Sequence, residues 1–420
     1  MKNQKLIVMF LLLSFIIVQN YSAQNFQVGA SVKNITPDPL LPVSGGVGIP
    51  NTAEIKKGEL TTRALVIIKG EVKIAIVSID NLGVPKIIGD RIREKIPSIK
   101  PENILIGATH THSAPDLYGF ADEQGNSGAD FNYIQFIVDK TAEAINEALN
   151  NIKSAKLKIS VNEIKGKIAY NSYAPKLYDP RCGIMQFIST KDNNVISTLI
   201  NYAIHPEVIG SERGICTPDL IGPLYNKIES KEGGVAIFLN SAQGGMVTAD
   251  NRLDDGKEAN DWNECIRIGE LLADESLRII SDAQIQTDPV INIASKEVTF
   301  PIETDLMKFI LKHSIIDYKI PNAEQISTTI NLINIGTAQI ITIPGEALPN
   351  IGFYIKRKMK TKNPFLFGLT NDAYGYILTK EDFNSFNTYN YISRTSLGER
   401  TGEILVNEIM GLIKNNKGSE

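Results

Sequence analysis

Two closely spaced histidines are the residues of this 420-residue chain best suited to metal chemistry. His110 and His112 follow the apolar run 103–108, and the chain contains only four histidines. Because side chains alternate along an extended segment, the i, i+2 spacing predicts both imidazoles on one face. A third histidine, His205, follows another apolar run, in Asn201-Tyr-Ala-Ile-His205-Pro206. Imidazole is the commonest zinc-binding side chain, so these histidines predict a metal-dependent enzyme.

The alternative is that each histidine is a buried, hydrogen-bonded structural residue, which is the usual state of a single histidine at a strand end. The paired spacing with a matching third histidine favours the metal site. The fourth, His313, lies in a helix-like pattern without a companion. We predict a structural role for it.

Further polar residues also come directly after apolar runs, where sites of open α/β sheets gather. Glu346 follows Pro-Gly, and it is either a carboxylate at a helix start or an oxygen ligand that completes the zinc site. Gly244-Gly245 could cradle an anion, although two glycines are weak evidence. Tyr374 and Tyr376 are more typical of packing than of metal binding. The sequence leaves open the roles of Asp80, Asp219 and Asn240.

The elements that must position these residues alternate along the chain. This alternation predicts an α/β fold, with a mixed β-sheet flanked by helices in a single large domain. A hairpin is predicted to turn at Gly70-Glu71. Strands are expected at 62–69, 73–79, 103–108, 156–161, 183–189, 195–203, 235–239, 291–300, 329–335 and 338–343, and helices at 84–96, 131–152, 220–229, 260–281, 348–359 and 399–413.

The N-terminus is typical of a secretory signal. Two lysines precede the apolar run 6–18, which is followed by small residues, and we predict cleavage near Ala23. We therefore expect an exported protein, periplasmic or secreted, with a catalytic domain over 24–415, a flexible tail over 416–420 and no transmembrane anchor. Removal of 1–23 changes the net charge from −4 to −6, which argues against nucleic-acid binding.

Three cysteines, Cys182, Cys216 and Cys265, allow at most one disulfide within the chain. Free buried thiols are equally compatible with their spacing, and the oligomeric state is left open.

Several segments together resemble the neutral ceramidase family. They are spread in family order over 26–410, and are Val28-Gly-Ala-Ser-Val-Lys-Asn-Ile-Thr-Pro37, Gly107-Ala-Thr-His-Thr-His-Ser113, Ala203-Ile-His-Pro206, Ile343-Pro-Gly-Glu346 and Gly375-Tyr-Ile-Leu-Thr379. The resemblance implies a catalytic Zn²⁺ held by His110, His205, Glu346 and Tyr376. It also implies that His112 is a polar group near the metal, and that Tyr391, or Tyr389 if the loop shifts, contacts the substrate carbonyl.

The chain departs from the family at three places. Val247 stands where the family has a catalytic serine, with Thr248 one position away as a candidate replacement. Tyr170-Asn171-Ser172 stands where the family has Asn-Arg-Ser, so the substrate-contacting arginine is missing. We also expect no C-terminal immunoglobulin-like β-sandwich. These departures indicate a short, divergent, bacterial-type member whose substrate is a smaller or more polar amide than ceramide.

The resulting hypothesis is an exported zinc amidohydrolase that cleaves an N-acyl or related lipid-like amide with metal-activated water. His112 is the candidate acid or base, and Tyr391 and Thr248 are further catalytic candidates. Two alternatives stay open. One is a metal-dependent hydrolase of another bond, such as an ester or a sugar-linked or cell-wall amide. The other is a non-catalytic exported binding protein on the same fold.

Overall fold

The computed structural model describes residues 26–120, 127–318, 320 and 324–416. The predicted signal segment, 1–23, and all of the predicted tail except Asn416 lie outside the described residues.

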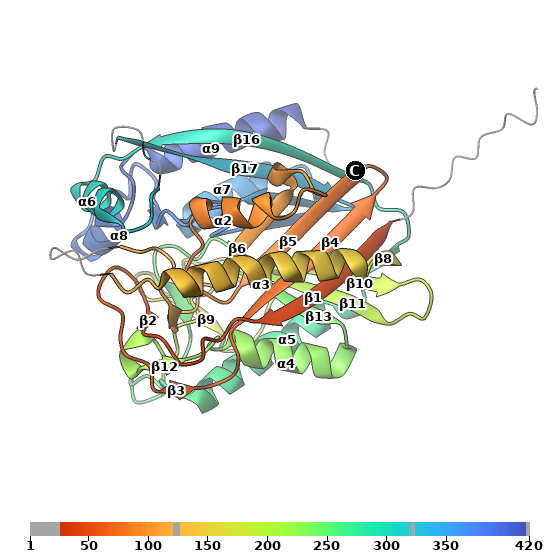
Figure 1. Ribbon diagram of the computed structural model, residues 1–420, viewed down its shortest axis with the longest axis horizontal. Helices are drawn as coiled ribbons and strands as arrows, with labels where there is room; N and C mark the ends of the chain where they lie inside the picture. The colour runs from red at the N-terminus through yellow and green to blue at the C-terminus, as the bar shows by residue number, and fades with distance from the viewer. Residues whose placement is uncertain (1–25, 121–126, 319, 321–323, 417–420) are drawn as a thin grey trace, which may run out of the picture.

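A nine-stranded mixed sheet forms the larger part of the fold, in the order β13-β11-β10-β8-β1-β4-β5-β6, with β15 pairing with β8 (Figure 1). The pairs β5–β6 and β11–β13 are parallel and the other pairs are antiparallel. The strands are β1 Gln27–Asn34, β4 Thr61–Lys69, β5 Val72–Ile79, β6 Ile104–Ala108, β8 Lys153–Glu163, β10 Arg181–Ser189, β11 Val195–Tyr202, β13 Val235–Asn240 and β15 Ile285–Gln286. The predicted α/β class with a mixed sheet is confirmed.

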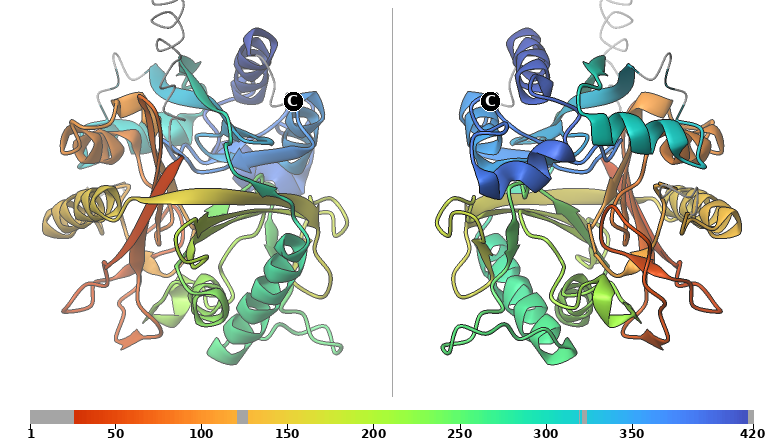
Figure 2. Two further views of the ribbon diagram at one scale, coloured as in Figure 1. Left: turned by 90° about the vertical axis from the view of Figure 1, so that its right-hand side faces the viewer. Right: turned by 90° about the vertical axis from the view of Figure 1, so that its left-hand side faces the viewer.

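This sheet bends sharply where β1 meets β8, so that its two halves face different directions (Figure 2). Only two residues of β1, Gln27 and Val28, pair with β8, and the short ladder permits the bend. Helices α2 (Lys86–Glu94) and α3 (Phe131–Asn150) cover the outer face of one half. Helices α4 (Ile221–Glu232) and α5 (Trp262–Ser281) cover the other.

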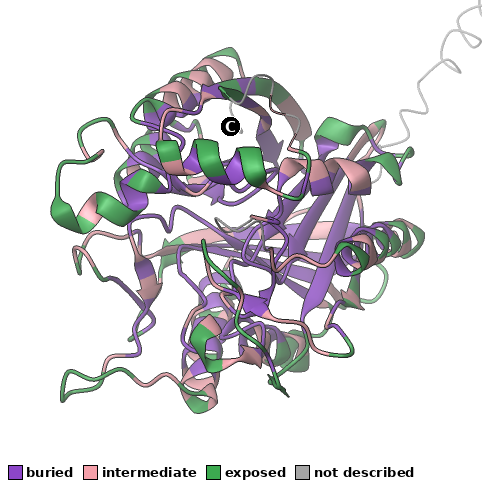
Figure 3. Cartoon of the chain, turned by 60° about the vertical axis from the view of Figure 1, so that its left-hand side comes forward, coloured by how far each residue is buried: buried purple, intermediate pink, exposed green. Residues whose placement is uncertain are grey.

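A second sheet of four strands has the order β16-β17-β18-β20 and packs on the inner faces of the bent sheet. Its strands are β16 Ile291–Pro301, β17 Gln325–Ile335, β18 Ala338–Thr342 and β20 Asn363–Phe367. Helices α6 (Asp305–His313), α7 (Pro349–Lys358) and α9 (Thr401–Asn415) pack on its outer face. The central strands are therefore buried on both faces, while the helices expose one side (Figure 3).

Helix α3 shows how the sequence fixes these layers. The Asp130 carboxylate caps the helix by accepting hydrogen bonds from the backbone N–H groups of Asn132 and Tyr133, at 2.8 and 2.9 Å. The predicted apolar stripe faces β1 and β4, with Tyr133, Ile137 and Ile145 buried. Burial of such a stripe, rather than helix propensity alone, stabilises the helix.

Three parallel strand pairs end close together, and this arrangement builds the site. They end at Ile79 with Ala108 in β5–β6, Tyr202 with Asn240 in β11–β13, and Thr342 with Phe367 in β18–β20. The segments that follow carry all the predicted site residues except Tyr391, as expected for the carboxyl ends of parallel strands.

Most predicted elements agree with the structure to within a few residues, including the hairpin that turns at Gly70. The helix-start interpretation of Glu346 is wrong. Glu346 lies in a short strand, β19 (Glu346–Ala347), and α7 begins only at Pro349. Other short pairs are β2 (Val43–Ser44) with β7 (Ala114–Pro115), β3 (Ile55–Lys56) with β12 (Ile215–Cys216), and β9 (Ala169–Asn171) with β14 (Val247–Ala249).

All three cysteines are buried and free, so no disulfide links them. Within the described part of the chain, no helix combines the length and the hydropathy needed to cross a membrane.

Candidate metal centre

Two histidine rings point the same type of nitrogen at one carboxylate oxygen. His110 Nε2 lies 3.4 Å and His205 Nε2 lies 3.0 Å from Oε2 of Glu346. The Nδ1 atoms face backbone carbonyls, at 2.5 Å from Leu82 O and 2.8 Å from Val247 O. Each Nδ1 therefore donates its hydrogen to a carbonyl, which leaves Nε2 as the nitrogen that faces Glu346 and that would bind a metal ion. In proteins, a hydrogen bond from the ring nitrogen that does not bind the metal orients a metal-binding histidine in the same way.

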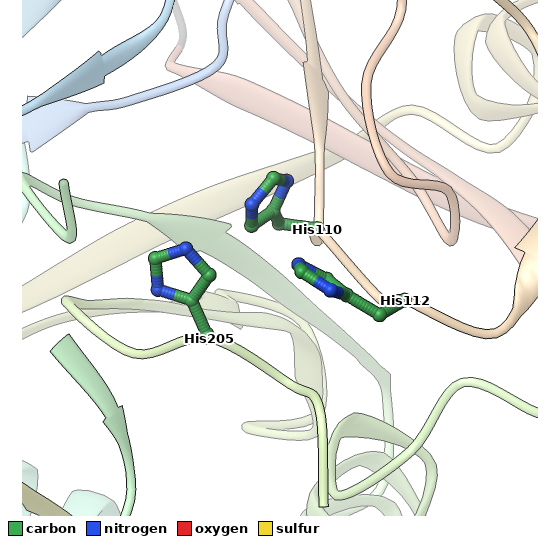
Figure 4. A group of neighbouring side chains, drawn as sticks. All are labelled: His110, His112 and His205. Atoms are coloured by element: carbon green, nitrogen blue, oxygen red, sulfur yellow. The ribbon is translucent and has the colours of Figure 1, made fainter. Parts of the chain in front are cut away.

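The backbone brings His110 there in a way that the sequence pattern did not predict. Strand β6 ends at Ala108, and His110 adopts a left-handed conformation with φ of 72°. The expected strand alternation therefore does not apply to His110 and His112. Their rings still meet, edge to face, with centroids 4.9 Å apart, and His205 lies within 5.6 Å of both (Figure 4). The prediction of neighbouring imidazoles is correct, but the physical reason given for it is wrong.

Glu346 and Tyr376 are placed by direct backbone pairing. They are register partners in the parallel pair β19–β21, where β21 is Tyr376–Ile377, and Glu346 N–H donates to Gly375 O at 2.8 Å. Tyr376 is buried, and its hydroxyl donates to the Met246 sulfur at 3.5 Å. The structure thus places Tyr376 beside the carboxylate, while its role as a fourth ligand stays a prediction.

A partly buried carboxylate that the sequence analysis missed completes the cluster. Glu207 Oε2 lies 3.4 Å from Nδ1 of His112, and the other ring nitrogen of His112, Nε2, is buried without a hydrogen-bond partner. The available signal was the spacing His205-Pro-Glu207, two residues after a predicted ligand.

The surroundings set the protonation of these groups. Burial is the largest influence on His112, and it lowers the pKa to about 3 although Glu207 opposes it. His112 is therefore neutral at pH 7. Burial alone would lower the pKa of His205, but the hydrogen bond to Glu346 raises it to about 9. Burial likewise disfavours an ionised Glu346, yet the two histidines lower the pKa of this carboxyl well below its usual range. A positive charge is favourable at this centre.

These residues fit a divalent metal ion. The ligand atoms of His110, His112 and His205 all lie within 4.8 Å of one another, close enough for one ion. His112 Nε2 is an unpartnered buried acceptor, and nitrogen with carboxylate oxygen is a donor set that suits zinc. Two donor sets are possible, because either His112 or Glu346 can join His110 and His205.

The remaining predicted catalytic residues lie at different distances from this centre. Tyr391 lines a cavity with His110 and Glu346, and its ring centroid is 5.9 Å from that of Tyr376. The alternative, Tyr389, stacks on Tyr173 instead. Tyr391 is thus the better placed of the two.

Thr248 does not face the two converging Nε2 atoms directly. It lies in β14, forms a bridge with His205 through the backbone, and its hydroxyl lies near Glu207 and lowers the pKa of that carboxyl. The catalytic role of Thr248 stays a prediction. Any influence of its hydroxyl on the site would pass through Glu207.

Asn240, whose role the sequence left open, ties two of the histidine segments together. Its side-chain amide donates to Thr109 O at 3.2 Å and to Ile204 O at 2.7 Å, and its Oδ1 accepts from Ile204 N–H at 3.1 Å. Thr109 precedes His110 and Ile204 precedes His205, so one fully buried side chain sets the spacing of both.

Asn240→Ala is expected to lower the free energy of unfolding by about 3 kcal/mol or more, because buried backbone groups left without a partner cost ~1–3 kcal/mol each. Zinc affinity should fall as well. Chemical denaturation and zinc titration measure the two effects. The control Asn132→Ala, on the exposed surface of α3, should change stability by less than ~0.5 kcal/mol. Equal effects of the two substitutions would contradict the proposal that Asn240 holds the His110 and His205 segments together.

The other residues singled out earlier have local roles. Asp80 accepts hydrogen bonds from the backbone and hydroxyl of Thr61 at 2.8 and 2.7 Å, and Asp219 accepts from the backbone of Ile209 and Leu220. His313 lies in α6, with its ring stacked on Phe309 and its Nδ1 facing Phe309 O. The structural role predicted for His313 agrees with this placement.

Comparison with known proteins supports the fold but not yet a family. The sequence matches no protein-family model and no curated protein. The structure is similar to neutral ceramidase from Pseudomonas aeruginosa, with a TM-score of 0.74 and 16% sequence identity over 94% of this chain and 76% of that one. A second solved structure, a ceramidase complexed with C2, has a TM-score of 0.73 and 15% sequence identity. The match covers 94% of this chain and 77% of that one. The chain therefore has the fold of these ceramidases, at identities too low to assign their activity.

Proposed function

We propose that this protein is an exported zinc-dependent hydrolase that cleaves the amide bond of an N-acyl amine. The observation that carries the proposal is the convergence of two backbone-oriented Nε2 atoms on Glu346, beside an unpartnered histidine nitrogen. A fold shared with ceramidases, as their names describe them, is consistent with amide hydrolysis.

The proposed ligands are His110, His205 and Glu346, with Tyr376 as the fourth. A zinc ion bound there polarises a carbonyl group and lowers the pKa of water. The chain's own groups do the rest. His112, neutral and held by Glu207, moves a proton between the water and the departing nitrogen. The Tyr391 hydroxyl donates a hydrogen bond to the carbonyl oxygen as negative charge develops, a contact typically worth ~3 kcal/mol of barrier.

Metal removal and substrate choice test this function. Protein stripped by a chelator should lose hydrolysis of N-acyl amides and recover it with one equivalent of zinc. A matched ester series separates the amidohydrolase from a hydrolase of another bond. Folded protein that binds no metal and cleaves neither series would instead support the non-catalytic binding protein.

Thr248→Val is expected to lower kcat at least tenfold, or ~1.4 kcal/mol of barrier, with zinc content unchanged. The physical reason is that the substitution keeps the shape but removes the hydroxyl that lies near Glu207, whose carboxylate is 3.4 Å from His112. Steady-state kinetics with elemental analysis measures this. Thr299→Val, at an exposed strand position, is the control. Unchanged kinetics in Thr248→Val would show that the residue is structural.

Export is proposed from the sequence of residues 1–23. The protein recovered from periplasm or medium is expected to begin near Gln24, since small residues precede that point. Intact-mass measurement checks this. A mass that includes Met1 would mean that the apolar run is an anchor rather than a cleaved signal.

A further inference from the structure

Two cavities of different character both have His112 in their lining. One is a small cavity of about 60 Å³ that also contains His110, Glu346 and Tyr391. Apart from these polar groups its walls are mainly apolar, with Leu82, Tyr118, Phe120, Met307 and Ile310. Tyr118 packs on Phe120, and Phe120 on Tyr318, with ring centroids 4.9 and 6.1 Å apart, so aromatic packing supports this wall of the cavity.

The other cavity is large and polar. Its volume is about 570 Å³, within the ~300–1,000 Å³ range of small-molecule sites. Hydroxyl and amide groups line it, from Tyr170, Ser172, Ser211, Thr248, Asn251 and Asn260. The charged residues of the lining are three glutamates, Glu207, Glu212 and Glu258, and one arginine, Arg213, so the lining disfavours an anionic ligand.

The two cavities are neighbours because they share part of their lining, so a passage between them would run past the shared residues. Gly45 and His112 line both of them. A Cβ atom at Gly45 would come within 2.7 Å of Ser211 Oγ and 3.4 Å of the Cβ of His112, so any side chain there would narrow the passage. A substrate that spans it places its scissile bond beside His112, with one end in each cavity.

We infer that the substrate is an uncharged, short-chain N-acyl derivative of a hydroxyl-rich amine of about amino-sugar size. This inference rests on the proposed amidohydrolase function. The acyl group occupies the small apolar cavity, beside the carbonyl-contacting Tyr391. The amine occupies the polar cavity, where hydroxyl, amide and carboxylate groups can pair with its hydroxyls. In the reaction the carbon–nitrogen bond breaks, the oxygen of water joins the carbonyl carbon, and the nitrogen gains a proton.

The test compares four amides on the zinc-loaded protein: the N-acetyl and N-hexadecanoyl amides of glucosamine and of dodecylamine. We expect kcat/KM to be highest for N-acetylglucosamine. It should fall at least tenfold when either the acyl chain is lengthened or the amine is made apolar. Equal or faster hydrolysis of the long-chain or dodecylamine compounds would overturn the inference while leaving the amidohydrolase intact.

Binding separates failure of the inference from failure of the function. Calorimetry should detect glucosamine, but not dodecylamine, binding to the zinc-loaded protein. Glucosamine binding without hydrolysis of any amide would support the assignment of the polar cavity and overturn the amidohydrolase. Preferential binding of dodecylamine would overturn the assignment of the polar cavity.

Substitutions in the two cavities locate the effect. Ile310→Ala enlarges the apolar cavity and should raise the relative kcat/KM for longer acyl chains several-fold, while Lys308→Ala, exposed on the same helix, should not. Because loss of a buried isoleucine side chain destabilises, Met307→Val provides a milder second enlargement. Asn260→Ala should raise KM for the glucosamine amide without changing kcat. Unaltered chain-length preference in both enlarged variants would contradict the role of the apolar cavity.

Discussion

The Glu346→Gln protein is expected to fold but to bind zinc at least ~100-fold more weakly, because loss of even an outer contact to a metal ligand costs 10–100-fold in affinity. The substitution preserves shape and removes the carboxylate on which both Nε2 atoms converge. Hydrolysis should fall with zinc occupancy. Zinc titration with a competing chelator, alongside circular dichroism for folding, measures the effect.

Glu71→Gln, on the exposed turn of the β4–β5 hairpin, is the matched control and should bind zinc normally. Full zinc affinity in Glu346→Gln would exclude the carboxylate as a ligand. It would then favour the alternative donor set, His110, His112 and His205.

His112→Asn should give the opposite pattern, with zinc retained and turnover lost. We expect kcat to fall on the order of 10²–10⁴-fold, the usual contribution of a positioned acid or base. The reason is that His112 is a neutral imidazole beside His110 and His205 but is not one of the proposed ligands. Elemental analysis and kinetics on the same preparation separate the two effects.

The chain offers a natural control in His313→Asn, since His313 lies on α6 and stacks only on Phe309. This variant should keep both zinc and activity. If His112→Asn lost zinc in parallel with activity, His112 would be a ligand and the proton-transfer role would have to pass to another group.

The sequence predicted the sheet strands well because their apolar runs are long and end at turn residues. The β4–β5 hairpin is an example. Helix α3 was also predicted well, because its apolar residues recur at helical spacing. It could not show that two halves of one sheet bend around a second sheet, because this packing depends on contacts between distant segments.

At the site, the histidines were found from residue type and position, but their geometry was not. The sequence suggested a helix start for Glu346. Its true setting is a short strand that pairs with β21, some thirty residues later in the chain, and local sequence does not reveal such a partner. Glu207 was missed because a single glutamate after His-Pro has no pattern of its own. The two cavities were also invisible in the sequence, since each is assembled from segments that meet only in the folded protein.

Because the backbone at His110 is left-handed, the residue found at this position in related chains should indicate whether they still have the metal site. A non-glycine residue in that conformation costs roughly 1–2 kcal/mol relative to glycine. The contacts of the imidazole help to offset this cost. A related chain that no longer needs the metal would gain stability by acquiring glycine there, so the residue at this position should distinguish working copies of the fold from those that have lost their chemistry.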